Sequence, residues 1–237
     1  MLVAIAHTQQ GLRKLSNQFH PDSRLKWCPD IVELRLDLFS PQPDSLTSLP
    51  FPILLTLRHS SEGGKFSGSP DQHLETISPY LPFATALDIE LTRAQSYPQT
   101  VSLYLQKNFP MILSYHNFSE TPPYSFLCQL LHEATSLGAS ALKIATALQK
   151  PSDLIPLIQI LAHSTRLPIA VMAIGPLAPT ARLFLAAAGS VLNYGWLHKP
   201  IVPGQLSAPT LAKLLHQFNI RPALGHTYPP PHSPANL

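Results

Sequence analysis

Charged residues are scarce in this chain. Asp, Glu, Lys and Arg make up 12% of its 237 residues, about half of the usual ~25%. The formal net charge is +3, and the sequence has no Lys/Arg runs and no interleaving of aromatic and basic residues. The charge pattern therefore gives little support to a nucleic-acid-binding protein and favours a small anion as the partner.

Cysteines and long apolar runs are also few. Cys28 and Cys128 are far apart, and neither belongs to a Cys-x-x-Cys or Cys/His pattern. We therefore expect reduced thiols and no metal site. The apolar run 2–6 is too short for a signal-peptide core, and no later run approaches the ~20 residues of a membrane span. These absences predict a cytoplasmic protein that does not bind membranes.

Short apolar segments rich in Val, Ile and Leu recur eight times, and helix-like segments lie between most of them. The strand-like segments are 2–6, 30–37, 52–58, 86–91, 110–117, 141–147, 168–175 and 191–197. The helix-like segments are 10–19, 72–81, 97–108, 124–137, 153–164, 180–188 and 208–218. The Pro/Ser-rich connection 38–51 is expected to hold only a short or irregular helix.

This alternation predicts a single-domain α/β protein, a (β/α)8 TIM barrel spanning residues 1–220. A doubly wound open sheet is the alternative. No Gly-x-Gly-x-x-Gly follows the first strand, and eight repeats fit a closed barrel better. Residues 221–237 are Pro-rich and poor in apolar residues, which predicts a disordered tail or a linker.

Lys143 is a lone amine in the apolar segment 141–147. Because alternate residues of a strand share a face, Lys143 lies with the small Ala141 and Ala145, opposite Leu142 and Ile144. Burial disfavours the ammonium form, and a neutral amine is a nucleophile toward carbonyl groups. The alternative is a lysine that extends from the strand end to solvent.

Further charged side chains gather near the ends of the second, third and fourth strands. Alternation directs them into the barrel, where each needs a partner or a ligand. They are Glu33, Arg35, Asp37, Arg58, Asp88 and Glu90, with Glu62 next to the pair Gly63-Gly64 in the loop after the third strand. The alternative is an internal network of ion pairs, which is common in barrels and is compatible with a function. The carboxyl ends of barrel strands, however, are also where active sites lie.

His116 ends the fifth strand, which should neighbour the strand of Lys143. An amine beside a group that takes and gives protons near neutral pH indicates Schiff-base chemistry. Condensation with a ketone gives an iminium that acidifies the adjacent carbon. His116 could then remove a proton there, and the enamine could expel a β-hydroxyl. Dehydration and aldol cleavage both follow this path.

Arg182 begins the segment after the seventh strand, and Gln205 lies in Pro203-Gly204-Gln205 after the eighth. An Arg offers a fork of donors that matches a carboxylate or a phosphate. Barrel phosphate sites commonly use a Gly-rich turn in these loops, and this turn is poor in Gly. A carboxylate ligand is therefore favoured.

Together these motifs resemble type I 3-dehydroquinate dehydratase, a Schiff-base lyase of the shikimate pathway. The motifs appear in that family's order and extend over residues 1 to about 218. They are Glu33-Leu34-Arg35-Leu36-Asp37, Thr56-Leu57-Arg58 with Glu62-Gly63-Gly64, Asp88-Ile89-Glu90, Ser114-Tyr115-His116-Asn117-Phe118, Lys143-Ile144-Ala145 and Pro203-Gly204-Gln205.

The resemblance implies that Lys143 forms an imine with the C3 ketone of 3-dehydroquinate. His116 would be the base at C2 and would later protonate the departing C1 hydroxyl, giving 3-dehydroshikimate for the biosynthesis of aromatic amino acids. Glu62 would orient the histidine. The resemblance also implies a homodimer that uses no cofactor.

The same resemblance assigns the substrate contacts. Glu33, Arg35 and Arg58 match the groups that hold the ring hydroxyls. Arg182 and Gln205 match the carboxylate and lid contacts, and Met172 matches a methionine that lines the pocket.

The chain departs from the family before Pro203. Ile201-Val202 stands where the family usually has Ser-Ala, so one hydroxyl donor to the substrate is lost, a change worth about 1 kcal/mol. Two alternatives remain. One is a class I aldolase, although the Gly-rich phosphate turn expected of such an enzyme is missing from this chain. The other is a non-catalytic ligand-binding barrel with a degenerate lid. The segment 217–221 also resembles the junction to a fused shikimate dehydrogenase domain in some relatives.

Overall fold

Eight parallel strands form the centre of the computed structural model, which describes residues 1–18, 27–163 and 166–220. They are β1 (Leu2–Ala6), β2 (Ile31–Arg35), β3 (Ile53–Thr56), β4 (Ala86–Glu90), β5 (Met111–Asn117), β6 (Ala141–Ala147), β7 (Ile169–Ile174) and β8 (Asn193–Trp196). They pair in the order β7-β6-β5-β4-β3-β2-β1-β8. This sequential order confirms the (β/α)8 barrel and shows that the doubly wound alternative is wrong.

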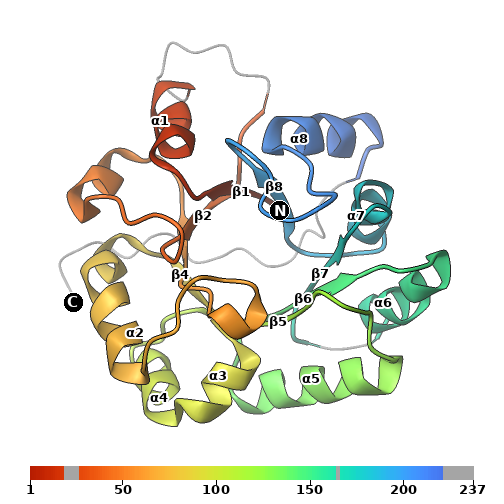
Figure 1. The fold of residues 1–237 in the computed structure, drawn as a ribbon, viewed down its shortest axis with the longest axis horizontal. Helices are drawn as coiled ribbons and strands as arrows, with labels where there is room; N and C mark the ends of the chain where they lie inside the picture. The colour runs from red at the N-terminus through yellow and green to blue at the C-terminus, as the bar shows by residue number, and fades with distance from the viewer. Residues whose placement is uncertain (19–26, 164–165, 221–237) are drawn as a thin grey trace.

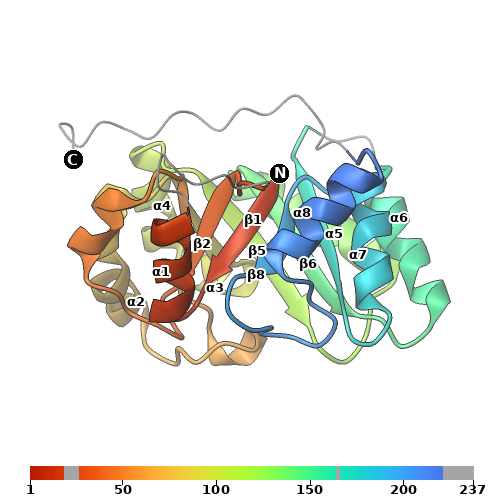
Figure 2. The same ribbon diagram turned by 90° about the horizontal axis from the view of Figure 1, so that it is seen from above.

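The helices form a ring around the strands, as Figure 1 shows. The α-helices are α1 (Gln9–Gln18), α2 (Pro70–Ile77), α3 (Leu91–Ser96), α4 (Pro98–Gln106), α5 (Tyr124–Ser136), α6 (Leu154–Leu161), α7 (Ala178–Ala187) and α8 (Ala208–Gln217). Short 3₁₀ helices are η1 (Pro43–Ser48), η2 (Ser60–Glu62), η3 (Ser78–Phe83) and η4 (Pro151–Asp153). Seen from above in Figure 2, helices flank the strands on both sides. None of the described helices is long and apolar enough to cross a membrane.

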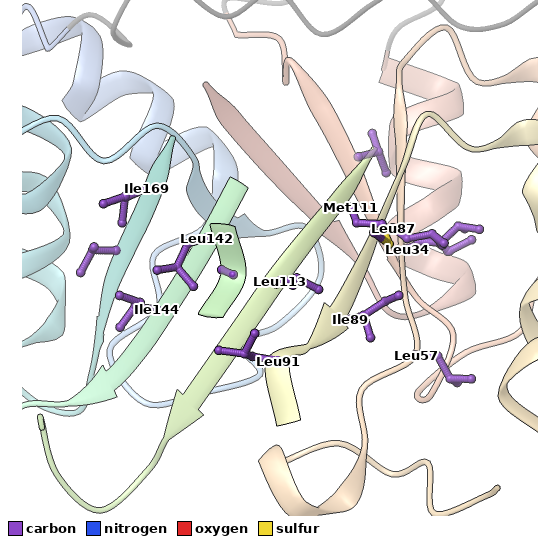
Figure 3. Close-up of a cluster of buried hydrophobic side chains, with 14 of the residues drawn as sticks. Leu34, Leu57, Leu87, Ile89, Leu91, Met111, Leu113, Leu142, Ile144 and Ile169 are labelled. Carbon is purple, nitrogen blue, oxygen red and sulfur yellow. The ribbon is translucent and has the colours of Figure 1, made fainter. Parts of the chain in front are cut away.

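Two apolar layers lie on opposite faces of the barrel wall. Figure 3 shows part of the outer layer, in which Leu34, Leu113 and Ile144 pack between the strands and the helices. The inner layer includes Ile112, with small residues such as Ala145 around β6. The period-two alternation read from the sequence produces both layers. It also leaves room inside the barrel for the long side chain of Lys143.

The barrel has a seam between β7 and β8, because these two strands stand at the ends of the hydrogen-bonded order. Side chains bridge the seam. The Ser190 Oγ accepts from the Val171 N–H at 2.9 Å and donates to the Val171 carbonyl at 3.1 Å. The Arg182 guanidinium donates to the carbonyls of Ala173 in β7, at 2.9 Å, and of Tyr194 in β8, at 3.3 Å. Together with one backbone hydrogen bond, from the Val191 N–H to the Ile169 carbonyl at 3.1 Å, these side chains complete the wall where a strand ladder is missing.

Several boundaries differ from the sequence prediction. Leu91 was expected to end a strand, but it begins α3, which the prediction missed because the helix follows β4 without a loop. The third strand ends at Thr56, so Arg58 lies in the loop beyond it. The irregular helix expected within 38–51 is η1. The predicted tail at 221–237 lies outside the described residues.

Substituting Ser190→Ala should lower the free energy of unfolding by about 1–3 kcal/mol, because the buried Val171 amide would lose its partner across the seam. Urea denaturation measures the change. Ser45→Ala is the control: its exposed hydroxyl bonds only to the Gln42 carbonyl, and its effect should stay within about 0.5 kcal/mol. Equal stability of the two variants would show that Ser190 does not hold the seam.

Candidate active site

A cavity of about 60 Å³ opens at the carboxyl ends of the strands. Its lining brings together every residue predicted for the site from the sequence: Glu33, Arg35, Arg58, Glu62, His116, Lys143, Met172, Arg182 and Gln205. These residues come from six different strands or from the loops and the helix α7 that follow them. The opening is at the end of the barrel where active sites of this fold lie.

Lys143 does not extend to solvent, since its side chain is only 4% exposed. Its Nζ donates to Asp88 Oδ2 at 2.8 Å and to Glu33 Oε1 at 3.2 Å. The ring of Tyr194 lies on another side, with its centroid 4.2 Å from Nζ. Two carboxylates and an aromatic face thus surround the amine, which contradicts the alternative of a solvent-seeking lysine.

Asp88 is the centre of the buried charge network. It accepts hydrogen bonds from Arg58 Nη2 at 2.7 Å and from Ser114 Oγ at 2.6 Å, in addition to Lys143. Burial works against its ionisation, but Arg58 and Lys143 hold the pKa of Asp88 far below its usual range. Asp88 is therefore a permanent anion that compensates two buried cations.

Arg58 is largely occupied by this network. Its Nη1 donates to Glu90 Oε1 at 3.0 Å and to Ser114 at 2.7 Å, and its Nη2 pairs with Asp88. Despite burial, the two carboxylates raise the pKa of Arg58. The internal ion-pair network that was the alternative to a binding role is thus present. Arg58 is part of this network and also lines the cavity.

His116 and Glu62 form a pair beside β6, the strand that carries Lys143. In the parallel register His116 lies opposite Ala145, two residues beyond Lys143. Its Nδ1 is 2.9 Å from Glu62 Oε2, and its backbone N–H donates to the same oxygen at 3.0 Å. Burial raises the pKa of Glu62 to about 7, although Arg58 opposes the shift. Burial, followed by the charges of Arg58 and Lys143, holds the pKa of His116 well below its usual range, so the ring is neutral at neutral pH.

The turn after Arg58 explains how Glu62 reaches His116. Gly63 adopts a left-handed conformation with φ of 78°, which favours glycine. A Cβ on Gly64 would lie 1.9 Å from the Arg58 carbonyl oxygen, so any larger residue would collide with the backbone. The glycine pair thus folds the loop tightly enough to bring the Glu62 carboxylate to the mouth of the barrel.

The remaining predicted residues line the other side of the cavity. Arg182 is buried, its bonds go to backbone carbonyls, and no described carboxylate forms an ion pair with it. Burial lowers the pKa of Arg182 to about 10, which still leaves it charged at neutral pH. Arg35 forms a bidentate pair with Asp37, at 2.8 Å for both bonds. Gln205 accepts from the Ile201 N–H at 3.0 Å and so holds the turn between these two residues, while Met172 is a buried wall residue.

Sequence reasoning missed two neighbours of the amine. Asp88 was expected to point inward, but its contact with Lys143 depends on how strands two apart in the wall face each other. Tyr194 was not among the predicted site residues, although alternation along β8 places it on the inner face. Among the described residues, no group of three His, Cys, Asp or Glu side chains is placed to hold a metal ion.

Comparison with known proteins decides the family. The profile of the family described as Type I 3-dehydroquinase matches residues 17–222, most of the chain. The chain belongs to the type I 3-dehydroquinase family. It is accordingly an enzyme of the shikimate pathway that dehydrates 3-dehydroquinate, in agreement with the resemblance noted in the motifs.

Curated relatives and solved structures agree with this assignment. The 3-dehydroquinate dehydratase of Latilactobacillus sakei is 31% identical over 199 residues, covering 78% of this chain and 82% of the relative. That of Methanocella arvoryzae is 29% identical over 197 residues, covering 81% and 89%. The crystal structure of the Aquifex aeolicus 3-dehydroquinate dehydratase superposes with a TM-score of 0.73 at 25% identity, covering 92% of this chain and 98% of that one.

Asp88→Asn should lower the free energy of unfolding by about 3–5 kcal/mol, because it leaves two buried cations without their shared anion. Chemical denaturation at neutral pH gives the value. Asp71→Asn, at an exposed position in the first turn of α2, makes the same chemical change and should cost at most about 1 kcal/mol. A similar small loss for Asp88→Asn would contradict the central role of this carboxylate.

Proposed function

We propose that the chain dehydrates 3-dehydroquinate through an imine on Lys143, with His116 as the proton-transfer group. The observation that carries the proposal is the placement of a buried amine in the same cavity as a neutral imidazole whose Nδ1 is held by a carboxylate. This arrangement supplies a nucleophile and an acid–base group on neighbouring strands. An active site that acted by acid–base chemistry alone would not need the amine.

The first stage is the attack of Lys143 on the C3 ketone. The ammonium gives up a proton, Nζ bonds to C3, and the carbinolamine loses water to form a cationic iminium. Asp88 and Glu33 lie beside Nζ and balance this positive charge. Because both carboxylates are in place before the reaction, the site needs no rearrangement when the iminium forms.

His116 then moves one proton. Its Nδ1–H donates to the ionised Glu62, which leaves the lone pair of Nε2 for the proton at C2. The electrons of the C2–H bond form an enamine, the enamine expels the C1 hydroxyl, and the imidazolium protonates that hydroxyl as it leaves. Hydrolysis of the product iminium consumes one water and frees Lys143. The balance is the loss of one water from the substrate.

Substrate placement follows from the charges that the protein leaves uncompensated. Arg182 is a buried cation without an acidic partner among the described residues, which suits the substrate carboxylate. Glu33 faces the ring hydroxyls, with Arg35 beside it. Ile201 and Val202 line the cavity where the family has a hydroxyl donor, and Gln205 holds that lid segment in its turn.

Borohydride reduction with 3-dehydroquinate should leave a stable adduct on Lys143, read by intact mass and peptide mapping. Lys143→Ala should give no adduct. His116→Ala should still form the adduct while turnover falls by roughly 10²–10⁴-fold, the range for loss of a general acid–base group. Turnover by the unmodified protein without any adduct would rule out the imine. An adduct accompanied by cleaved products and no enone absorbance would favour the aldolase alternative.

The kcat/KM of the protein should fall as the pH decreases through about 7, because Glu62 gains a proton there and can no longer hold Nδ1–H. Above that pH the carboxylate is ionised and His116 is neutral, which is the reactive pair. In Glu62→Gln the amide oxygen still accepts a hydrogen bond but does not titrate. The acid limb of the pH profile of kcat/KM should therefore move to lower pH, where His116 itself is protonated. Glu120→Gln, at an exposed position, should keep the limb unchanged. A limb that stays in place in Glu62→Gln would exclude Glu62 as its source.

A further inference from the structure

His7 is a buried histidine directly after β1, beside the cavity although not among the residues that line it, and the proposed mechanism does not use it. It follows β1 directly and continues the inward face of Val3 and Ile5, and Ile5 lines the cavity. The register pairs Ile5 with Glu33 on β2 and with Trp196 on β8. Two residues further along, His7 therefore lies between Arg35 and His198.

The ring of His7 is not satisfied by the described part of the protein. The residue is 5% exposed, and neither Nδ1 nor Nε2 forms a hydrogen bond of ordinary geometry there, although the ring interacts with the backbone of Ile5. Buried polar atoms are nearly always paired in folded proteins, so two unpaired nitrogens on one ring call for an explanation. A partner that is present only when substrate is bound provides one.

The guanidinium groups on this side of the cavity are largely in use. Arg35 gives its Nε and Nη2 to Asp37, and Arg58 is held by Asp88, Glu90 and Ser114. A hydroxyl entering this side of the cavity thus finds few unoccupied protein groups. His7 is a buried group near Arg35 whose ring forms no hydrogen bond of ordinary geometry with the described protein.

The charge state of His7 indicates the kind of ligand. Burial, followed by the charges of Arg35, His198 and Lys199, lowers the pKa of His7, while its hydrogen-bonding interaction with the backbone of Ile5 raises it. A neutral imidazole carries one donor and one acceptor. A hydroxyl group also donates one hydrogen bond and accepts others, so the two are complementary.

We infer that His7 is a substrate-binding residue that hydrogen-bonds a ring hydroxyl of the keto acid bound at Lys143. The inference rests on the proposed function and adds to it a contact from β1. It places the hydroxyl-bearing edge of the ring toward β1 and β2, and the ketone toward β6.

The test compares His7→Leu with a matched control, His73→Leu. His73 is also buried, with an unpaired Nδ1, but it lies in the outer helix α2 between the rings of Phe66 and Tyr97, away from the strand ends that form the cavity. His7→Leu should reduce kcat/KM by roughly 2- to 12-fold, mainly through KM, as expected for one lost hydrogen bond. Its thermal midpoint should not fall, because the substitution removes unpaired polar atoms. His73→Leu should leave the kinetics unchanged, and His7→Gln, which keeps a donor and an acceptor, should recover part of the loss.

Substrate analogues that lack the C4 or the C5 hydroxyl identify the contact. One of the two analogues should have a lower kcat/KM than 3-dehydroquinate with the unmodified protein. The substitution His7→Leu should not lower the kcat/KM of that analogue further, since the two changes remove the same bond. Independent losses for both analogues would overturn the inference, as would an unchanged kcat/KM in His7→Leu. These outcomes are separate from failure of the proposed function, in which the unmodified protein would form no borohydride adduct; that result would overturn both.

Discussion

The buried carboxylate of Asp88 is the interaction on which the rest of the site depends. A barrel interior is a poor solvent for ions, and this one contains Arg58 and Lys143 within hydrogen-bonding distance of a single side chain. Each cation has a second carboxylate, Glu90 for Arg58 and Glu33 for Lys143, but Asp88 is the ionised anion that they share. The same carboxylate therefore allows the barrel to fold around its charges and keeps the amine at the mouth.

The two faces of the barrel wall divide structure from chemistry. Outward Leu and Ile side chains bind the helices to the strands, while the inner face carries the polar residues of the cavity. The seam between β7 and β8 contributes both to the structure of the wall and to the chemistry of the cavity. Arg182 bridges the seam through its contacts with Ala173 and Tyr194 and also lines the cavity. Its position is thus determined by the architecture before any ligand binds.

Much of the fold and of the cavity lining could be predicted from the sequence. Period-two alternation was sufficient to direct Glu33, His116 and Lys143 inward, since each lies in a strand. Alternation could not show that Asp88 and Lys143 touch, because that contact depends on the curvature of the whole wall. It also could not reveal the seam between β7 and β8, or that the Arg182 guanidinium would donate its hydrogen bonds to backbone carbonyls. The homodimer, the compartment and the fused domain concern other molecules or other residues, and they stay predictions.

The loop that carries Ile201 and Val202 has a thermodynamic consequence. Both side chains pack against the inner apolar layer of the barrel. This packing is stabilised by the removal of apolar surface from water, which carries a negative heat-capacity change and little enthalpy near room temperature. The contact of the loop with the barrel should therefore weaken on cooling and strengthen in salting-out ions such as sulfate. A loop held only by hydrogen bonds would not share that dependence on temperature and salt.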